Sequence, residues 1–362
     1  MKNIHDYCII MAGGQGRRLW PTSRKDMPKQ FIDFFGTGRT LLQQTYDRMA
    51  RIFPHENIIV STYEGYHDIV RRQLPEVDEA NILLEPVQLS TAPAVMWASA
   101  FVAARDGEAR VLVTPTDHHI VNTDAFEKHV RCGLDFVGAH DEFLALGVKA
   151  TVPHTAYGYI QTEQAELSDG MYRVKTFTEK PAADYARLFV ESGEFLWNTG
   201  MFLWNVRTMY RLIGRITPAV AHQMESNAGM IGRQEQLSII RELYPANMSR
   251  SVDLVILNDS AQVCVQECNF GWADVGCWPE LHRVLPKDVD GNAVVEGARA
   301  MFSACANNIV SLPEGGVAVI KGLDGYIVSQ RDNLLVICPK DDPMAVRRMA
   351  DEAAMQLGPD LL

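Results

Sequence analysis

Short apolar runs rich in β-branched residues alternate with amphipathic stretches through the first third of the chain. The strand-like runs are YCIIMAG, NIIVST, NILLEP and RVLVTPTD, and the helix-like stretches are TLLQQTYDRMARI, GYHDIVRRQL and TAPAVMWASAFVAAR. This alternation is typical of βαβ units, in which helices join parallel strands and cover both faces of the sheet. It predicts an α/β domain whose ligand crevice lies at the carboxyl ends of the strands.

The pattern changes twice further along the chain. From about residue 143, the segments FLALGV, YGYIQT, YRVKTFTEK and FLWNTGMFLW predict strands, with a helix at ADYARLFVES, and we interpret them as an antiparallel extension of the sheet. From about residue 290, short strands are broken by Gly, Asn and Asp until a helix at DPMAVRRMADEAAMQ. We therefore predict two domains, residues 1–285 and a small β domain at residues 286–362 that forms a stacked coil of strands.

Composition excludes several classes of partner. Lysine and arginine number 34 against 45 acidic residues, a net charge of −11, so general binding to nucleic acid or to an anionic membrane is not expected. Seven cysteines without CxxC pairs fit neither a disulfide framework nor a zinc site, which predicts reduced thiols in a cytoplasmic protein. No apolar run approaches the roughly 20 residues that a membrane span requires.

The segment MAGGQGRRLWPTSRKDMPKQF, residues 11–31, combines a glycine turn with many cations. A dinucleotide fingerprint is excluded because Leu19 stands where the third glycine is needed, and the spacing of a P-loop does not occur. Amides of the glycines could cradle a triphosphate, and the cations could neutralise charge as pyrophosphate departs. The alternative is a solvated basic turn in which glycine supplies only geometry. The cations are Arg17, Arg18, Arg24, Lys25 and Lys29.

The same segment is similar to the opening motif of sugar-1-phosphate nucleotidylyltransferases, and its WP and PKQF elements resemble the mannose-1-phosphate guanylyltransferase branch. EPVQLSTAPAV, TPTDHHI, YGYI, FTEKP, WNTGMFLW and WADVGCW resemble the family in the same order, and the motifs together span residues 11–278. The C-terminal β domain also resembles the family's. The resemblance implies a Rossmann-like nucleotidyltransferase domain with a mixed, mainly parallel sheet, followed by a β-helix-like domain. It implies transfer of GMP from GTP to α-D-mannose 1-phosphate, dependent on Mg²⁺.

The resemblance also assigns the catalytic residues. Asp117 in TPTDHHI and Asp274 in WADVGCW match the family's metal-binding carboxylates, a ligand type that suits Mg²⁺. Arg17 and Lys29 are assigned to the triphosphate and the leaving pyrophosphate. Considered singly, Asp117 could instead cap a turn and Asp274 could form a structural hydrogen bond. Because the attacking phosphate is already ionised, we do not expect a histidine as general base and interpret His118 and His119 as packing residues or as residues behind the site.

Sugar recognition requires hydrogen-bond partners for hydroxyl groups and a backbone close to the ring. By the resemblance, Gly158, Glu179 and Asn198 have these roles and Lys180 binds the sugar phosphate. As residues alone, Gly158 could form a β-bulge and Asn198 a turn.

The nucleotide is expected at the opening loop and at the start of the TAPAV helix. The residues assigned to it are Ala12, Gly13, Gly14, Gly16, Glu85 and Thr91. The chain departs from the family at Leu89-Ser90-Thr91, where Arg-Asn-Thr is usual, and this removes a cation and an amide. Cys277 in place of serine and Asn258 in place of glutamate are milder departures.

Two alternative functions stay open at this point. One is a nucleotidylyltransferase for another sugar 1-phosphate, such as a heptose, or for another nucleotide. The other is a regulatory homologue that binds sugar nucleotides without turnover, and the retention of Asp117, Asp274, Arg17 and Lys29 favours catalysis over it.

The small β domain is also expected to mediate a homodimer. We expect it to expose strand edges and the apolar residues Val294, Val295, Ile309 and Val319, which a lone short sheet would struggle to bury.

Overall fold

The computed structural model describes residues 2–168, 170–218, 221–222, 250–259, 263–295 and 297–361. The chain divides into two compact units. The first unit comprises Met1–Gly13, Tyr46–Pro115 and Ile120–Trp272, and the second unit comprises Gly14–Thr45, Thr116–His119 and Ala273–Leu362. The glycine-rich loop therefore belongs to the same unit as the C-terminal region. A domain boundary at residue 285 stays a prediction from the sequence.

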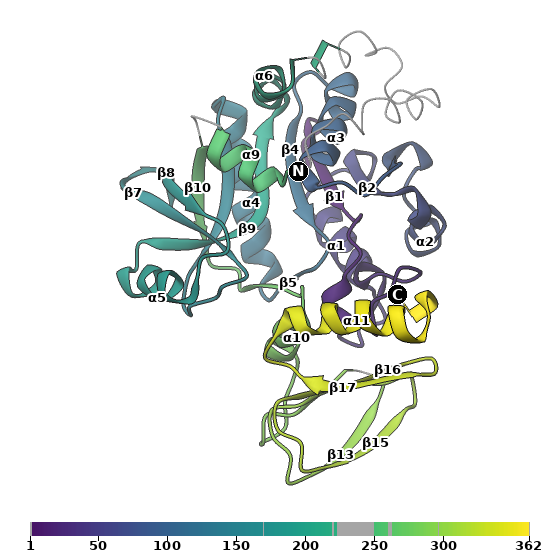
Figure 1. Ribbon diagram of the computed structural model, residues 1–362. Coiled ribbons are helices and arrows are strands. Elements are labelled where there is room, and N and C mark those ends of the chain that lie inside the picture. Colours follow the sequence, from purple (N-terminus) through teal and green to yellow (C-terminus); the bar gives the residue numbers. More distant parts are fainter. Residues whose placement is uncertain are drawn as a thin grey trace. The chain divides into compact units, whose positions relative to one another are not determined.

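Among the described residues, nine strands form the main sheet in the order β3-β2-β1-β4-β9-β6-β10-β8-β7. Figure 1 labels these strands except β3 and β6. The strands are β1 (Asp6–Met11), β2 (Ile58–Tyr63), β3 (Ile82–Glu85), β4 (Arg110–Pro115), β6 (Phe143–Lys149), β7 (Gly158–Ser168), β8 (Met171–Thr178), β9 (Phe195–Asn205) and β10 (Val263–Cys268). Strands β1 to β4 pair in parallel, whereas β9 runs antiparallel to β4 and β6, and β8 runs antiparallel to β10 and β7. The mixed sheet and its antiparallel extension are confirmed.

The strand order creates a switch point at β1. The chain passes from β1 to β2 and β3 on one side, and β4 then pairs with the other side of β1. In open α/β sheets such a reversal leaves a crevice at the carboxyl ends of the two strands, because the helices that follow them lie on opposite faces. Strand β1 ends at Met11, so Ala12 and Gly13 lie at this edge of the first unit.

Helices cover both faces of this sheet. They are α2 (His67–Gln73), α3 (Thr91–Arg105), α4 (Thr123–Ala139), α5 (Ala183–Ser192), α6 (Val206–Ile216) and α9 (Val252–Asp259), while α1 (Leu41–Ala50) continues from the second unit into the first. Buried residues of α3, α6 and α9 share one apolar cluster with Ile9, Val111 and Val113 of β1 and β4. Helix α4 packs against β4, β6, β9 and β10. Burial on both faces explains the nearly continuous apolar runs of β1, β2 and β4.

The second unit contains two small sheets. Its strands are β12 (Ala293–Val294), β13 (Arg299–Ser303), β14 (Ile309–Ser311), β15 (Val317–Lys321), β16 (Tyr326–Arg331) and β17 (Leu334–Pro339). Strands β12, β14 and β16 pair in parallel and β17 closes the sheet antiparallel, while β13 and β15 form a separate parallel pair. Helix α10 (Trp278–Val284) precedes these strands and α11 (Pro343–Leu357) follows them, as expected for DPMAVRRMADEAAMQ. Strands β5 (His118–Ile120) and β11 (Trp272–Asp274) pair with each other.

The glycine-rich loop is anchored in the core of the second unit. Leu19 and Trp20 are buried in one apolar cluster with Val336 of β17 and with Val346 and Ala350 of α11. Trp278 lies in the same cluster, and its Nε1 donates a hydrogen bond of 3.0 Å to the carbonyl oxygen of Trp20. The C-terminal region therefore forms part of the support of the loop.

The expected exposure of apolar residues in the C-terminal strands is wrong in two cases. Val295 and Ile309 are buried, because they pack in the apolar cluster that also contains Trp278 of α10 and Val346 of α11. Val294 is half-buried and only Val319, at 71% exposure, is open to solvent as expected. The exposed apolar residues are instead Met301 on β13, Val317 and Val319 on β15, and Leu335 and Ile337 on β17.

All seven cysteines are free thiols, as the sequence predicts. Among the described residues, no helix is both long enough and apolar enough to cross a bilayer.

Candidate active site

Three charged side chains expected to be catalytic lie together in the second unit. Lys29 begins the short turn η2 (Lys29–Phe31), and its Nζ donates to Oδ2 of Asp117 and, at 3.4 Å, to the carbonyl oxygen of Val275. The backbone N–H of Val275 donates in turn to the carbonyl oxygen of Asp117 at 2.8 Å. The carboxyl groups of Asp117 and Asp274 are close enough for each to shift the pKa of the other. The sequence therefore folds so that residues 29, 117 and 274 meet.

The two carboxyls have different electrostatic environments. Burial raises the pKa of both, since it favours the neutral form. For Asp117, the charges of Lys29 and His118 and the hydrogen bond from Lys29 outweigh burial, so its pKa falls below the usual range. For Asp274, burial and the negative charge of Asp117 raise the pKa to about 6, against the opposing charges of Lys29 and Arg18. Asp117 is therefore the ionised member of the pair, and Asp274 is the one that retains a proton in mild acid.

The pair Asp117 and Asp274 fits a hard divalent cation. Oδ1 of Asp274 is buried and has no hydrogen-bond partner among the described residues. Two neighbouring ionised carboxylates repel each other, and a divalent cation bound by both would remove that repulsion. No group of three or more His, Cys, Asp or Glu side chains suited to a metal occurs in the part of the chain that the structure describes. Mg²⁺ suits so small a protein ligand set, since it keeps water molecules and accepts phosphate oxygens as ligands.

The adjacent arginines of the loop point to different partners. Arg17 pairs with Asp351 of α11 and does not join the carboxylates. Arg18 lies beside them: a Cβ built on Gly276 would be 2.8 Å from Nη2 of Arg18 and 2.9 Å from Oδ1 of Asp274. Gly276 is thus the residue that lets Arg18 approach Asp274. From the sequence, Arg18 was counted among the loop cations but the catalytic role was assigned to Arg17, because the direction of the Arg18 side chain depends on contacts with distant residues.

Gly14 and Gly16 lie in the same unit and shape the loop around Lys29. The carbonyl oxygen of Gly14 accepts a bond of 2.9 Å from Nε2 of Gln30. Gly16 has φ +64°, and a Cβ there would be 2.4 Å from Oγ of Ser23 and 2.9 Å from Cγ of Lys29. Oγ of Ser23 accepts from the backbone N–H of Lys29 at 2.9 Å. Glycine at position 16 is therefore required both by backbone conformation and by close approach to Lys29.

The other predicted nucleotide residues lie in the first unit. The backbone of Ala12 bonds to β2, donating to Ser61 at 2.7 Å and accepting from Oγ1 of Thr62 at 3.0 Å. A Cβ on Gly13 would lie 3.1 Å from Oε1 of Glu85, at the end of β3. Ala12, Gly13 and Glu85 therefore gather at the carboxyl ends of β1 and β3, around the intervening strand β2.

Two further residues complete this edge. Nε2 of Gln88 donates to the carbonyl oxygen of Gly13 at 2.9 Å and to the hydroxyl of Tyr66 at 3.1 Å, a contact that the sequence did not reveal. Thr91 begins α3, and its Oγ1 accepts from the backbone N–H of Val252 at 2.9 Å. Its hydroxyl thus joins α3 to the start of α9.

The four predicted sugar-phosphate residues also come together in the first unit. Gly158 of β7 is the register partner of Asn198 of β9. A Cβ on Gly158 would lie 2.8 Å from Oε2 of Glu179 and 2.7 Å from the ring of Phe177. Glu179 pairs with Lys180, whose backbone N–H donates to the carbonyl oxygen of Tyr157 at 3.2 Å. The pairing of β7 with β9 thus positions two of these residues, and the turn after β8 positions the other two.

Asp253 of α9 is a fifth member that was not predicted from the sequence. Its Oδ1 accepts a bond of 2.7 Å from Nδ2 of Asn198. Burial raises its pKa, and the charge of Glu179 acts in the same direction, while the bond from Asn198 and the charge of Lys180 oppose. A signal was present in SVDLVILN, because an aspartate in an apolar helix needs a polar partner. Its partner lies 55 residues earlier in the chain, which the sequence alone does not reveal.

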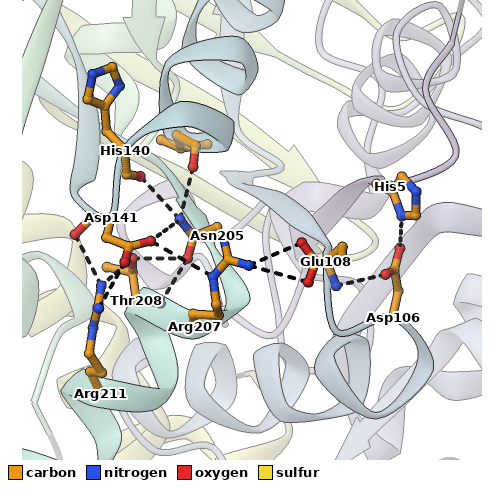
Figure 2. Close-up of polar contacts among 10 residues, drawn as sticks. His5, Asp106, Glu108, His140, Asp141, Asn205, Arg207, Thr208 and Arg211 are labelled. Carbon is orange, nitrogen blue, oxygen red and sulfur yellow. Dashed lines mark hydrogen bonds and ion pairs between the residues drawn. The ribbon is translucent and has the colours of Figure 1, made fainter.

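A separate polar network lies at the other end of the main sheet (Figure 2). Nδ1 of His5 lies 2.8 Å from Asp106, Arg207 pairs with Glu108 at 3.1 Å, and Arg211 pairs with Asp141 at 2.9 Å. The network lies at the carboxyl end of the antiparallel strand β9 and at the amino ends of β1 and β4. Part of it borders a cavity of about 440 Å³. Each of these three basic groups has an acidic partner, so the network joins strand and helix ends.

The chain is similar to known proteins over most of its length. A family model described as nucleotidyl transferase matches residues 7–291. The mannose-1-phosphate guanylyltransferase of Klebsiella pneumoniae is 33% identical over 336 residues, which cover 91% of this chain and 70% of that protein. The alginate biosynthesis protein AlgA of Pseudomonas syringae is 32% identical over 345 residues, with coverage of 94% and 70%.

A solved structure resembles the whole chain as well. The crystal structure of mannose-1-phosphate geranyltransferase from Thermus thermophilus superimposes with a TM-score of 0.85 at 30% identity. The match covers 96% of this chain and 99% of that one, so it includes the C-terminal strands.

Proposed function

The chain belongs to the nucleotidyl transferase family, and from this premise we propose that it transfers GMP from GTP to α-D-mannose 1-phosphate, giving GDP-mannose and pyrophosphate. Relatives named mannose-1-phosphate guanylyltransferase match over most of the chain, which favours mannose over a heptose and an enzyme over a binding protein. The observation that carries the proposal is the meeting of buried Lys29 with the partly buried carboxyls of Asp117 and Asp274. A regulatory homologue would have no need to preserve a partly buried carboxylate pair beside a lysine.

The reaction joins two anions and requires little covalent chemistry from the protein. A phosphate oxygen of mannose 1-phosphate attacks the α-phosphorus of GTP, and the bond from that phosphorus to the bridging oxygen breaks as pyrophosphate leaves. The attacking oxygen is already ionised, so no proton has to be removed. Catalysis therefore depends on positioning and on neutralising charge.

Asp117 and Asp274 would hold Mg²⁺, which supplies positive charge to the reacting phosphates when it is bound. Lys29 is fixed by its contact with Asp117 and is proposed to neutralise the departing pyrophosphate. Arg18 is added to this group on the basis of its place beside Asp274 and Gly276. Contact of Arg17 with the triphosphate, as expected from the sequence, stays a prediction.

The substrate residues are proposed on their local geometry. The gathering of Ala12, Gly13 and Glu85 at the carboxyl ends of β1 and β3 supports their contact with the nucleotide. Gly14, Gly16 and Thr91 remain proposed nucleotide-binding residues, as assigned from the sequence. Glu179, Asn198 and Asp253 offer acceptors and a donor to sugar hydroxyls, Lys180 offers charge to the sugar phosphate, and Gly158 offers open backbone. The added residues, Gln88 and Asp253, extend the assignment made from the sequence.

Three broader properties are proposed on separate observations. Free thiols at all seven cysteines support a cytoplasmic location. Parallel pairing of β12 with β14 and β16, and of β13 with β15, supports a β-helix-like coil. The exposed apolar residues of β13 and β15 support a homodimer.

The test is pyrophosphate release from purified protein with each of GTP, ATP, UTP and dTTP in combination with mannose, glucose and heptose 1-phosphates. We expect GTP with mannose 1-phosphate to give the highest kcat/KM and to require added Mg²⁺. Preference for another pair would reassign the substrates. Binding of sugar nucleotide without any pyrophosphate release would support the regulatory alternative.

A further inference from the structure

The turn η1 (Arg17–Leu19) is held by the end of the second unit. Arg17 donates through Nη2 to Oδ1 of Asp351 in α11. Immediately after the turn, Nε1 of Trp20 donates to the carbonyl oxygen of Leu361 at 2.7 Å. The side chains of Leu19 and Trp20 are buried against α11. One side of the turn is thus fixed by residues 346–361.

The other side of the turn faces the carboxylates. In a 3₁₀ turn, successive side chains are about 120° apart around the axis, so Arg17 and Arg18 must point in different directions. When Arg17 points to α11, Arg18 lies beside Asp274 and Gly276. A rotation of the turn that moved Arg17 away from Asp351 would also move Arg18 away from Asp274.

We propose that Asp351 is a positioning residue for nucleotidyl transfer, which acts by holding Arg17 so that Arg18 faces Asp274. The inference rests on the proposed function, because it gives Arg18 a role at the proposed Mg²⁺ ligands. It also gives Arg17 an indirect role in place of the direct contact with triphosphate expected from the sequence. The two roles for Arg17 make opposite predictions when the charges of the pair are exchanged.

The pair is suited to orienting the turn and contributes little to stability. The side chains of Arg17 and Asp351 are 30% and 42% exposed, and ion pairs of that exposure add little to the stability of a protein. The apolar contacts of Leu19 and Trp20 remain when the pair is removed. A displacement of about 1 Å in a catalytic group can nevertheless reduce a rate about 100-fold.

The test compares Asp351→Asn with Glu352→Gln, a matched change at the next, exposed position of the same helix. We expect Asp351→Asn to lower kcat about tenfold with little change in the KM for mannose 1-phosphate. Its melting temperature should lie within about 2 °C of wild type, because the change alters the orientation of the Arg18 side chain and not the folding of the protein. Glu352→Gln should match wild type in all three. Wild-type kcat in a folded Asp351→Asn protein would overturn the proposal.

Charge exchange then separates the two roles of Arg17. Arg17→Asp should lower kcat at least as much as Asp351→Asn, and adding Asp351→Arg to it should restore kcat to within about threefold of wild type, because the reversed pair holds the turn again. If Arg17 contacted the triphosphate, the exchanged pair would stay as impaired as Arg17→Asp, and the proposal would be wrong. Should Asp351→Asn fail to fold, Arg17→Gln measures the same loss.

Hydrogen exchange tests the pair independently of the reaction. The amides of Leu19 and Trp20 bond within the turn, to Gly16 at 3.0 Å and to Arg17 at 3.4 Å. We expect Asp351→Asn to speed exchange in the peptide covering residues 14–23 about tenfold, with Glu352→Gln unchanged. Unaltered exchange would contradict the proposal even if the enzyme is active. Failure of the wild-type chain to release pyrophosphate would contradict the proposed function and leave this readout intact.

Discussion

At the scale of single residues, Asp117 and Asp274 have opposite pKa shifts although each carboxyl acts on the pKa of the other. Lys29 is hydrogen-bonded to Asp117 and keeps it ionised, while burial makes Asp274 hold its proton longer. In mild acid and without a cation, the proton on Asp274 relieves the repulsion between the two carboxyls.

We predict that Asp117→Asn, Asp274→Asn and the double variant lose activity to a similar extent, about 100-fold or more, because a cation held by two ligands is lost with either one. Each single variant should fold, since an amide preserves shape and relieves repulsion. Added Mg²⁺ should raise the melting temperature of wild type and not that of the double variant. A folded Asp274→Asn enzyme with near wild-type turnover at limiting Mg²⁺ would make Asp274 a structural residue only.

Asp253 gives a prediction for pH. Its pKa is raised by burial and by Glu179, so the folded state binds this proton more tightly than the unfolded state does. Its stabilising contribution is complete below the ordinary pKa of aspartate and is lost as pH rises through the raised value. Asp253→Asn should therefore be about 1 kcal/mol more stable than wild type at pH 7 and equal to it at about pH 3.5, as measured by urea unfolding.

The same substitution should weaken sugar binding, because an amide group replaces one of the carboxyl oxygens beside Asn198. We expect the KM for mannose 1-phosphate to rise about tenfold, with the KM for GTP little changed. For the stability prediction, equal free energies of unfolding of Asp253→Asn and wild type at all pH values would show that burial does not disfavour the charged form of Asp253.

At the scale of elements, the glycine-rich loop shows how backbone conformation positions a cation. Gly16 opens η1 with φ +64°, and its missing side chain leaves room for Ser23 and Lys29. Ser23 in turn fixes the backbone of Lys29. The position of the lysine therefore depends on a glycine well before it in the sequence.

Gly16→Ala should reduce kcat/KM about 100-fold or more, because its Cβ would displace Ser23 and Lys29. Gly38→Ala is the matched control: Gly38 has φ +74° but nothing within 4 Å of an added Cβ. Both variants should lose about 1 to 2 kcal/mol of stability from the left-handed backbone. Only Gly16→Ala should lose activity, and similar activity in the two variants would show that close approach at Gly16 is unimportant.

Elements with strong local patterns were predictable from the sequence, and their partners were not. The apolar runs of β1, β2 and β4 and the periodic segment DPMAVRRMADEAAMQ of α11 were predicted as the correct type of element, because burial and periodicity are local properties. The burial of Val295 and Ile309 was missed because it arises from packing against α10 and α11, which the local pattern of the strands does not reveal. Asp253 and Arg18 were missed for the same reason, since their contacts are made with residues distant in sequence.

At the scale of the whole molecule, the outer face of β13 and β15 carries three exposed apolar side chains between the exposed charges of Arg299 and Lys321. Met301 and Val319 are register partners, and Val317 lies two positions along the same strand. Met301, Val319 and Val317 are 58%, 71% and 60% exposed. Successive residues of these two strands point alternately inwards and outwards, so the outward-pointing residues of both strands share one face.

We predict that the chain is a homodimer at micromolar concentration and that Met301→Lys with Val319→Lys makes it monomeric, since charges on an apolar contact oppose association. Val289→Lys is the control, because Val289 is fully exposed elsewhere in the same unit. Light scattering should give twice the monomer mass for wild type and for the control. A monomeric wild-type protein would contradict the prediction.

The contacts that complete the loop have a consequence for biosynthesis. Thr22 lies 307 residues before its hydrogen-bond partner Ser329, and Arg17 lies 334 residues before Asp351. At a translation rate of about 5 to 20 residues per second, the ribosome takes roughly 17 to 67 s to make the second partner after the first. During that interval the first unit can fold, while the loop has neither its core nor its ion pair. A nascent chain would therefore become catalytically competent only after residue 351 has emerged from the ribosome. Stalling before that point should leave the main sheet folded and the glycine-rich loop unformed.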